Sequence, residues 1–351
     1  MKSFFIDPPV RNGFGPRLRP AILPVLILLT SLWTNFAFPQ SAPDYFLFEI
    51  KPPAGVPALA NPSCVFYDSH HGEIYVADTG NDRVVIFDRD GNYVFEFSER
   101  QHLPSPRCLA TDSTGRILAL CERQPDRIVV LDYDGRYLRD WPLKDARTDS
   151  SVRATSFAVG RGDTVYVAAE EPPRLFGYTT EGTRLWEADI LTDLPPDERM
   201  QQALGNIACF AGRLIVPTPM YSNLTVFDTH GRFVKVFGYA GGAPGKLSFP
   251  IAAASDGQGG TLVLDKHRHT VLQYGPDDIF VQEFGGMGTG AGWFYHPISL
   301  ASDESSRCFV LQSFMGRVQA AKIPGAHETP GTQISAAKPQ GGLSVGTQDN
   351  K

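Results

Sequence analysis

Four histidines are the residues of this chain that could bind a metal ion. They fall in segments expected to be loops: His102, His267, His269 and His296. Imidazole is the commonest transition-metal ligand in proteins, so a metal-dependent lyase or hydrolase is one interpretation of this set. A metal site also needs matched geometry and partners that orient each ring, whereas solvated loop histidines need neither. The sequence therefore predicts no cofactor, with zinc or calcium as the alternative.

Four arginines occupy equivalent places in a repeating pattern, each at the start of an expected strand: Arg83, Arg127, Arg174 and Arg317. A ring of such groups would bind an anionic ligand or partner, because forked guanidinium donors match carboxylates and phosphates. Alternatively, each arginine could hydrogen-bond loop carbonyls or a neighbouring carboxylate such as Asp78. One arginine per repeat in the same place favours this structural interpretation. Both sets together are the candidate ligand- or partner-binding residues.

Residues for nucleophilic catalysis are not arranged in any known motif. The chain has no Ser-His-Asp or Cys-His signature in a usable context. The five cysteines show no C-x-x-C or zinc-ligand spacing: Cys64, Cys108, Cys121, Cys209 and Cys308. Their odd number leaves at least one thiol outside any intramolecular disulfide, and buried apolar thiols are the simpler interpretation. A disulfide stays open because sequence alone cannot assign one. We expect no enzymatic activity.

Two glycine-rich segments, residues 237–250 and 284–297, share the pattern F-G-x-x-G-x-x-x-G-x-[LF]-x-x-P. A phosphate-binding loop needs a helix after its glycines, because the helix N-terminus supplies amides and a dipole for the anion. A proline and an expected strand follow here instead. The segments are therefore interpreted as connections between repeats.

Composition and charge limit the class of protein. The 351 residues are 42% hydrophobic, with 23 Phe and 12 Tyr, which is enough for a packed core and excludes global disorder. The formal charge is −6, and the first 42 residues carry four basic side chains and one acidic one, which leaves −9 on the remainder. Such an acidic body is a poor match for a phosphate backbone, so no nucleic-acid partner is predicted.

The N-terminus resembles a targeting segment. Arg11, Arg17 and Arg19 precede an apolar run over residues 21–33, and small polar residues follow. The run is shorter than the roughly 20 residues that span a bilayer. Residues 1–42 are therefore predicted to be a signal peptide, with an uncleaved N-terminal anchor as the alternative. Either implies export to the periplasm or extracellular space, with membrane contact only through an uncleaved segment.

A repeat of 44 to 49 residues is measured between four turn glycines, Gly91, Gly135, Gly182 and Gly231. Each unit holds alternating apolar runs joined by a turn such as Asp90-Gly91, the signal for a type I′ hairpin. A single four-stranded sheet has two faces to bury, so such units stack face to face around an axis. Six units predict an all-β, six-bladed β-propeller of four-stranded antiparallel blades.

Residues 74–88, IYVADTGNDRVVIFD, resemble the core motif of NHL repeats, and the resemblance covers about residues 45–323. It implies that the first strand of each blade lines a central channel. It also implies that the second-to-third-strand loops lie on the top face, where the candidate arginines and histidines would gather. NHL domains of bacterial envelope proteins imply binding of a ligand or protein on that face.

A second six-bladed family, peptidyl-α-hydroxyglycine α-amidating lyase, implies the alternative function. In that family three histidines hold a channel zinc, and each follows the proline that begins an inner strand. This chain has Ser63, Arg107, Ile251 and Ile298 at those places, and His296 precedes its proline. The departure argues against the lyase. The His and Glu arrangement of streptogramin lyase cannot be matched to this chain residue by residue either.

The last repeat ends at Ile323 without a fourth strand, whereas residues 45–50, YFLFEI, resemble one. We expect this N-terminal strand to complete the last blade, because an open edge would leave backbone groups unpaired. Residues 324–351 are rich in Gly, Ser, Thr, Gln and Pro and are predicted to be disordered. The sequence thus predicts a propeller over residues 43–323, acting as a monomeric binding or scaffold protein of the cell envelope.

Overall fold

The computed structural model describes most of the chain between residues 42 and 325. The described ranges are 42–98, 102–122, 126–145, 150–192, 195–199 and 202–325. All of them belong to one compact unit, Ser41–Lys351. The predicted leader and nearly all of the predicted disordered tail lie outside these ranges. No helix among the described residues is long and apolar enough to cross a membrane.

The strands form six antiparallel sheets of four. From the axis outward, blade one is β2 (Cys64–Asp68), β3 (Glu73–Asp78), β4 (Arg83–Asp88) and β5 (Tyr93–Phe97). Blade two is β6 (Pro106–Thr111), β7 (Ile117–Cys121), β8 (Arg127–Leu131) and β9 (Tyr137–Pro142). Blade three is β10 (Arg153–Val159), β11 (Val165–Glu170), β12 (Arg174–Tyr178) and β13 (Arg184–Asp189).

The second half of the ring has the same order. Blade four is β14 (Ala208–Phe210), β15 (Arg213–Thr218), β16 (Asn223–Asp228) and β17 (Phe233–Phe237). Blade five is β18 (Pro250–Ser255), β19 (Thr261–Asp265), β20 (Thr270–Tyr274) and β21 (Phe280–Gly285). Blade six is β22 (Ser299–Ser302), β23 (Arg307–Gln312), β24 (Arg317–Lys322) and β1 (Phe46–Ile50). The short helical turns are η1 (Thr79–Asn81), α1 (Pro196–Arg199), η2 (Pro219–Tyr221) and η3 (Ser313–Met315).

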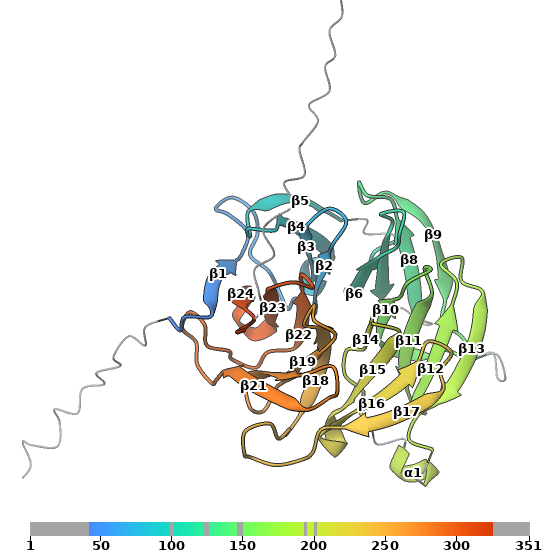
Figure 1. Cartoon of the computed structure of the whole chain (residues 1–351). Coiled ribbons are helices and arrows are strands. Elements are labelled where there is room, and N and C mark those ends of the chain that lie inside the picture. The colour runs from blue at the N-terminus through green and yellow to red at the C-terminus, as the bar shows by residue number, and fades with distance from the viewer. Residues whose placement is uncertain are drawn as a thin grey trace, which may run out of the picture. The chain divides into compact units, whose positions relative to one another are not determined.

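The blades surround a common axis (Figure 1). Each inner strand contacts the inner strand of the next blade, and β22 contacts β2, so the ring closes. The predicted all-β, six-bladed β-propeller of four-stranded antiparallel blades is therefore confirmed. We call the face with the second-to-third-strand loops and the blade-to-blade connections the top face. The face with the first-to-second-strand turns is the bottom face.

The N-terminal strand β1 completes blade six, as predicted. It pairs antiparallel with β24, from Phe46 opposite Ala321 to Ile50 opposite Val318 (Figure 1). The amide of Lys322 donates a hydrogen bond to the Tyr45 carbonyl at 2.7 Å. The outer edge of β24 is thereby covered, and the two ends of the ring are held together by main-chain hydrogen bonds.

The turn at Asp90-Gly91 differs from the predicted type I′ hairpin. Gly91 has a φ of +83°, but Asp90 is not among the residues with positive φ, and a type I′ turn requires both. The Gly91 amide bonds the Asp88 carbonyl at 3.0 Å, and the register of β4 and β5 shifts between Ile86 and Phe87. This is a type I turn followed by a glycine bulge, which the Asp88 side chain stabilises by accepting nearby amides.

These turn glycines also allow the blades to pack closely. A Cβ at Gly135 would lie 2.3 Å from the Phe97 ring, and one at Gly182 would lie 2.6 Å from Trp141. In both cases the aromatic residue belongs to the outer strand of the preceding blade. The glycine is therefore required twice, for its positive φ and for the ring that occupies the place of a side chain.

Candidate functional site

A cavity of about 1020 Å³ occupies the central channel. All six inner strands contribute to its wall, and turns of the bottom face form its mouth. The mouth includes Ser69, Ser113, Arg161, Gly212 and Glu304. No described residue of the second-to-third-strand loops lines the cavity, so it opens on the bottom face. None of the eight candidate arginines and histidines contributes to it.

Polar and apolar groups contribute about equally to the lining of the cavity, and several of the polar groups lie at its mouth. Phe66, Tyr67 and Phe210 line it and are half-buried. At the mouth, Asp112 accepts a hydrogen bond from Arg116 Nε at 2.6 Å. Burial opposes ionisation of Asp112, but hydrogen bonds from neighbouring side chains and amides outweigh it and lower the pKa of this carboxyl. Small-molecule sites usually have a mostly apolar lining with a few polar groups, so this cavity is more polar than most such sites.

Side chains in and just before the inner strands connect one blade with another. Six positions, one per blade, form a belt around the channel; five lie in inner strands and Asn206 lies two residues before β14: Cys64, Cys108, Ser156, Asn206, Ala252 and Ser299. Ser299 accepts a hydrogen bond from the Val65 amide of blade one at 3.2 Å. Asn206 donates to the Ile298 carbonyl at 3.3 Å, from blade four to blade six. Four of the belt positions also line the cavity: Cys64, Cys108, Asn206 and Ser299.

Two of the four candidate arginines are buried on the top face in ion pairs. Arg83 donates from Nε to Asp78 Oδ2 at 2.7 Å and from Nη1 to Glu96. Arg317 donates to Glu49 Oε2 at 2.9 Å. In both cases the carboxylates belong to the arginine's own blade. These guanidinium groups link the third strand to the outer strand.

The other two arginines are also paired. Arg127 forms an ion pair with Asp140 of the outer strand β9. Arg174 lies 2.5 Å from Asp145 and 3.3 Å from Asp189. The four arginines are thus all engaged by carboxylates of the chain, and the structure brings no two of them together in one anion site.

Sequence reasoning missed a fifth pair of this kind. Blade five has Thr270 at the arginine position, and Arg268 in the preceding loop takes its role. Arg268 Nη2 lies 2.7 Å from both carboxylate oxygens of Glu283 in β21. The signal was present in the sequence, because an acidic residue occurs near the middle of several outer strands: Glu96, Asp140, Glu283 and Glu49.

Three of the four candidate histidines lie close together between blades five and six. His269 is buried, and its Nδ1 accepts a hydrogen bond from the His296 amide at 3.2 Å. Burial, helped by the neighbouring His296 and His267 rings, lowers the pKa of His269. His102 lies apart, stacked on Tyr137 with ring centroids 3.8 Å apart. Within the described ranges, no three His, Cys, Asp or Glu side chains are grouped as a metal ion requires.

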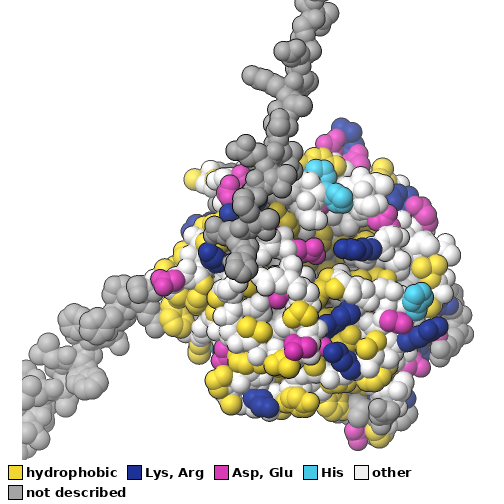
Figure 2. All heavy atoms as spheres, in the orientation of Figure 1, with side chains coloured by type: hydrophobic (Ala, Val, Ile, Leu, Met, Phe, Trp, Pro, Cys, Tyr) yellow, Lys and Arg dark blue, Asp and Glu magenta, His cyan; other side chains and the backbone are white. Residues whose placement is uncertain are grey.

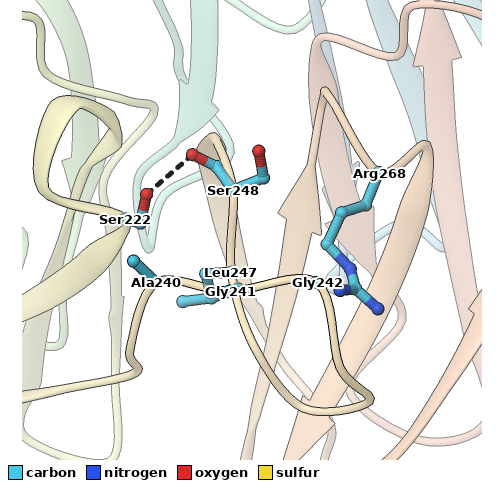
Figure 3. A pocket seen from close by; sticks show the side chains of 7 residues that line it. All are labelled: Ser222, Ala240, Gly241, Gly242, Leu247, Ser248 and Arg268. Carbon is cyan, nitrogen blue, oxygen red and sulfur yellow. Dashed lines mark hydrogen bonds between the residues drawn. The ribbon is translucent and has the colours of Figure 1, made fainter.

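The two glycine-rich segments connect β17 to β18 and β21 to β22, as predicted. Each forms the same parallel bridge, Ala240 with Leu247 and Met287 with Phe294. An open pocket of about 500 Å³ lies beside the first connection. Ser222 Oγ donates a hydrogen bond to the Ser248 carbonyl there at 2.7 Å (Figure 3). Its one cationic side chain, Arg268, is already neutralised by Glu283, so the pocket does not attract an anion strongly.

Large apolar side chains project from the top-face loops of blades four to six. Met220 in η2 is 59% exposed and Phe314 in η3 is 79% exposed. In the glycine-rich connections, Tyr239 is 72% exposed and Met287 is 66% exposed. We call these four residues the apolar loop set. Sequence reasoning missed them because exposure depends on neighbouring loops that are distant in sequence.

Charged side chains are mixed on the face seen in Figure 2. Acidic, basic and hydrophobic groups are interspersed there, without a large area of one charge. Electrostatic attraction of a highly charged partner is therefore not a property of this face.

Neither a protein-family model nor a curated protein sequence matches this chain. Its fold is nevertheless found in solved structures. A streptogramin B lyase is 14% identical, with a TM-score of 0.55 over 80% of this chain and 87% of that one. A Bacteroides thetaiotaomicron protein of unknown function is 9% identical, with a TM-score of 0.57 over 78% and 72%. Kuenenia stuttgartiensis hydrazine synthase is 11% identical, with a TM-score of 0.54 over 78% and 99%.

These similarities show the propeller fold alone. Two of these proteins are enzymes of different kinds and the third is of unknown function, and propeller folds carry unrelated functions in general. The NHL resemblance of residues 74–88 stays a prediction from the sequence. Function has to be argued from the sites of this chain.

Proposed function

We propose that this propeller is a non-enzymatic binding protein whose top face, over blades four to six, receives a protein partner. One observation carries the proposal, the exposure of the apolar loop set to water. Single exposed apolar residues are ordinary, but several large ones on neighbouring loops of one face are typical of protein interaction sites. Methionine and aromatic side chains are also enriched at such sites.

The chemistry of the loops defines the partner. The candidate arginines are engaged by Asp78, Glu96, Asp140 and other carboxylates, so they offer little free charge. The Lys246 ammonium lies 5.0 Å from the centre of the Tyr239 ring and keeps a cation at the edge of the set. We therefore expect a partner segment with aliphatic or aromatic side chains and a nearby carboxylate. Desolvation of the loop side chains would supply most of the binding free energy.

Site-specific photo-crosslinking tests this proposal. p-Benzoylphenylalanine at Phe314 or Met287 should crosslink one discrete protein in the native cell envelope. The same probe at Val234 or Val281, which are similarly exposed on the outer strands β17 and β21, serves as the matched control. Crosslinks of equal yield from the outer-strand positions would contradict a top-face site.

The cell envelope is the proposed location. The basic residues and the apolar run at the N-terminus support export. We expect the mature chain to begin near Phe38 or Pro43. Intact-mass measurement that finds Met1 or Lys2 retained would contradict cleavage and favour the anchor.

A second candidate function is binding of a small organic molecule in the central cavity. The volume of about 1020 Å³ and the aromatic wall favour it. Ser302 lines the cavity and is half-buried, so Ser302→Trp would fill part of it. A ligand that raises the melting temperature of the parent chain should fail to do so in this variant. Ser98→Trp, at an exposed position, is the control.

A further inference from the structure

Two thiols of adjacent blades meet in the central channel. Cys64 of β2 and Cys108 of β6 occupy equivalent places in the inter-blade belt, and their Sγ atoms are 3.9 Å apart. Both side chains are largely buried by protein, yet both line the cavity that opens on the bottom face. A small reagent in the cavity can therefore reach them, while the bulk of the protein keeps larger molecules away.

The two thiols are chemically different. The Cys64 thiol donates a hydrogen bond to the Cys108 sulfur, and this contact lowers the pKa of Cys108 and raises the pKa of Cys64. The thiolate is the nucleophile in thiol chemistry. Cys108 is therefore suited to attack first, and Cys64 is placed to attack second.

The other three cysteines lack this arrangement. Cys121 and Cys308 are fully buried and do not line the cavity. Cys209 lines the cavity, but burial raises its pKa to about 11, and no hydrogen bond joins it to a second thiol among the described residues. These three residues are internal controls for the pair.

We propose that Cys64 and Cys108 are a dithiol site that reacts with small disulfides entering the channel and closes to a disulfide between blades one and two. The Cys108 thiolate attacks the small disulfide, forms a mixed disulfide and releases one small thiol. Cys64 then loses its proton and attacks the Cys108 sulfur, which releases the second small thiol. The two protein thiols lose two electrons and two protons, and the small disulfide is reduced to two thiols.

The geometry allows this closure with a local change. A disulfide bond is about 2.05 Å long, so the two sulfurs must approach by about 2 Å through rotation of their side chains. Serine at two other belt positions, Ser156 and Ser299, shows that a hydroxyl is accommodated in this layer. Cys64→Ser and Cys108→Ser are therefore suitable single variants.

Oxidised glutathione is the probe for the test. The full chain is reduced, freed of reductant and incubated with the probe, and then its intact mass and non-reducing peptide map are measured. We expect a mass loss of about 2 Da and a peptide pair that joins Cys64 to Cys108. Cys64→Ser should instead keep one glutathione adduct on Cys108, and Cys108→Ser should react far more slowly. Cys209→Ala should behave as the parent chain.

The parent chain alone decides the proposal, so a variant that fails to fold does not obscure the result. An unchanged mass, or adducts on Cys64 and Cys108 that never resolve to a linked peptide pair, would overturn it. A disulfide that joins Cys209 to either residue would also overturn the assignment. A rise of a few degrees in the melting temperature of the oxidised chain, reversed by reductant, would support a bond between two blades.

Discussion

At the residue scale, the arginines link strands within their blades. The repeat position of Arg83 suggested either an anion ring or a structural role, and its observed partners are Asp78 and Glu96. Sequence spacing identified the arginine and one neighbour, Asp78. It did not identify Glu96, because the pairing of β4 with β5 includes a bulge that fixes which outer-strand residue faces the arginine. Contacts of this kind depend on register, which single residues do not encode.

Arg83→Gln and Arg127→Gln should therefore differ in stability. Arg83 is buried, and its loss leaves Asp78 buried without its cation, so the free energy of unfolding should fall by about 3 kcal/mol. The Arg127 pair is more exposed, and its loss should cost about 1 kcal/mol or less. Urea denaturation measures both. Equal losses, or a specific binding defect in a variant of unchanged stability, would favour recognition over structure.

His269 gives the chain a dependence on pH. Its folded-state pKa is lowered, so the unfolded chain binds this proton more readily and stability should fall as pH drops through the ordinary histidine value near 6.5. The neutral ring accepts the His296 amide, and protonation breaks that bond. His269 has a φ of +59°, which asparagine tolerates. Between pH 7.5 and 5.5 the melting temperature of the parent chain should fall by a few degrees more than that of the His269→Asn variant. Identical pH profiles for the two proteins would reject His269 as the cause.

At the element scale, the closure of the ring by β1 has a direct consequence. Deletion of residues 45–50 removes the partner of β24 and the buried Ile50, so the melting temperature should fall strongly. Deletion of residues 324–351 removes a segment without an apolar pattern and should change it little. Thermal unfolding of both variants and the parent chain is the measurement. Equal effects would contradict closure by β1.

The elements were predictable because they depend on short-range patterns. Alternating apolar residues located the strands, and the shared glycine pattern of residues 237–250 and 284–297 located two connections correctly. The type I′ turn at Asp90-Gly91 was wrong, because Asp-Gly also fits a type I turn with a glycine bulge. Both turns place Gly91 at positive φ, where Phe48 of the neighbouring blade packs against it, so the sequence signal alone does not separate them.

At the scale of the whole molecule, the ring has two different faces. The bottom face opens into the central cavity, and the top face over blades four to six carries the apolar loop set. The sequence predicted the top face as the binding face, a prediction that only binding data can test. It gave no sign of the exposed Tyr239 and Phe314, because the solvent exposure of a loop residue is set by loops of neighbouring blades.

Quantitative binding of the crosslinked partner to two double variants tests the central claim most directly. Met287→Ser with Phe314→Ser removes half of the apolar loop set, and Val234→Ser with Val281→Ser removes similar apolar exposure from the outer strands. We expect the first pair to weaken binding at least about tenfold, since a central apolar side chain contributes roughly 1–2 kcal/mol, with an unchanged melting temperature. Unchanged affinity in the first pair, or an equal loss in the second, would contradict a top-face binding site.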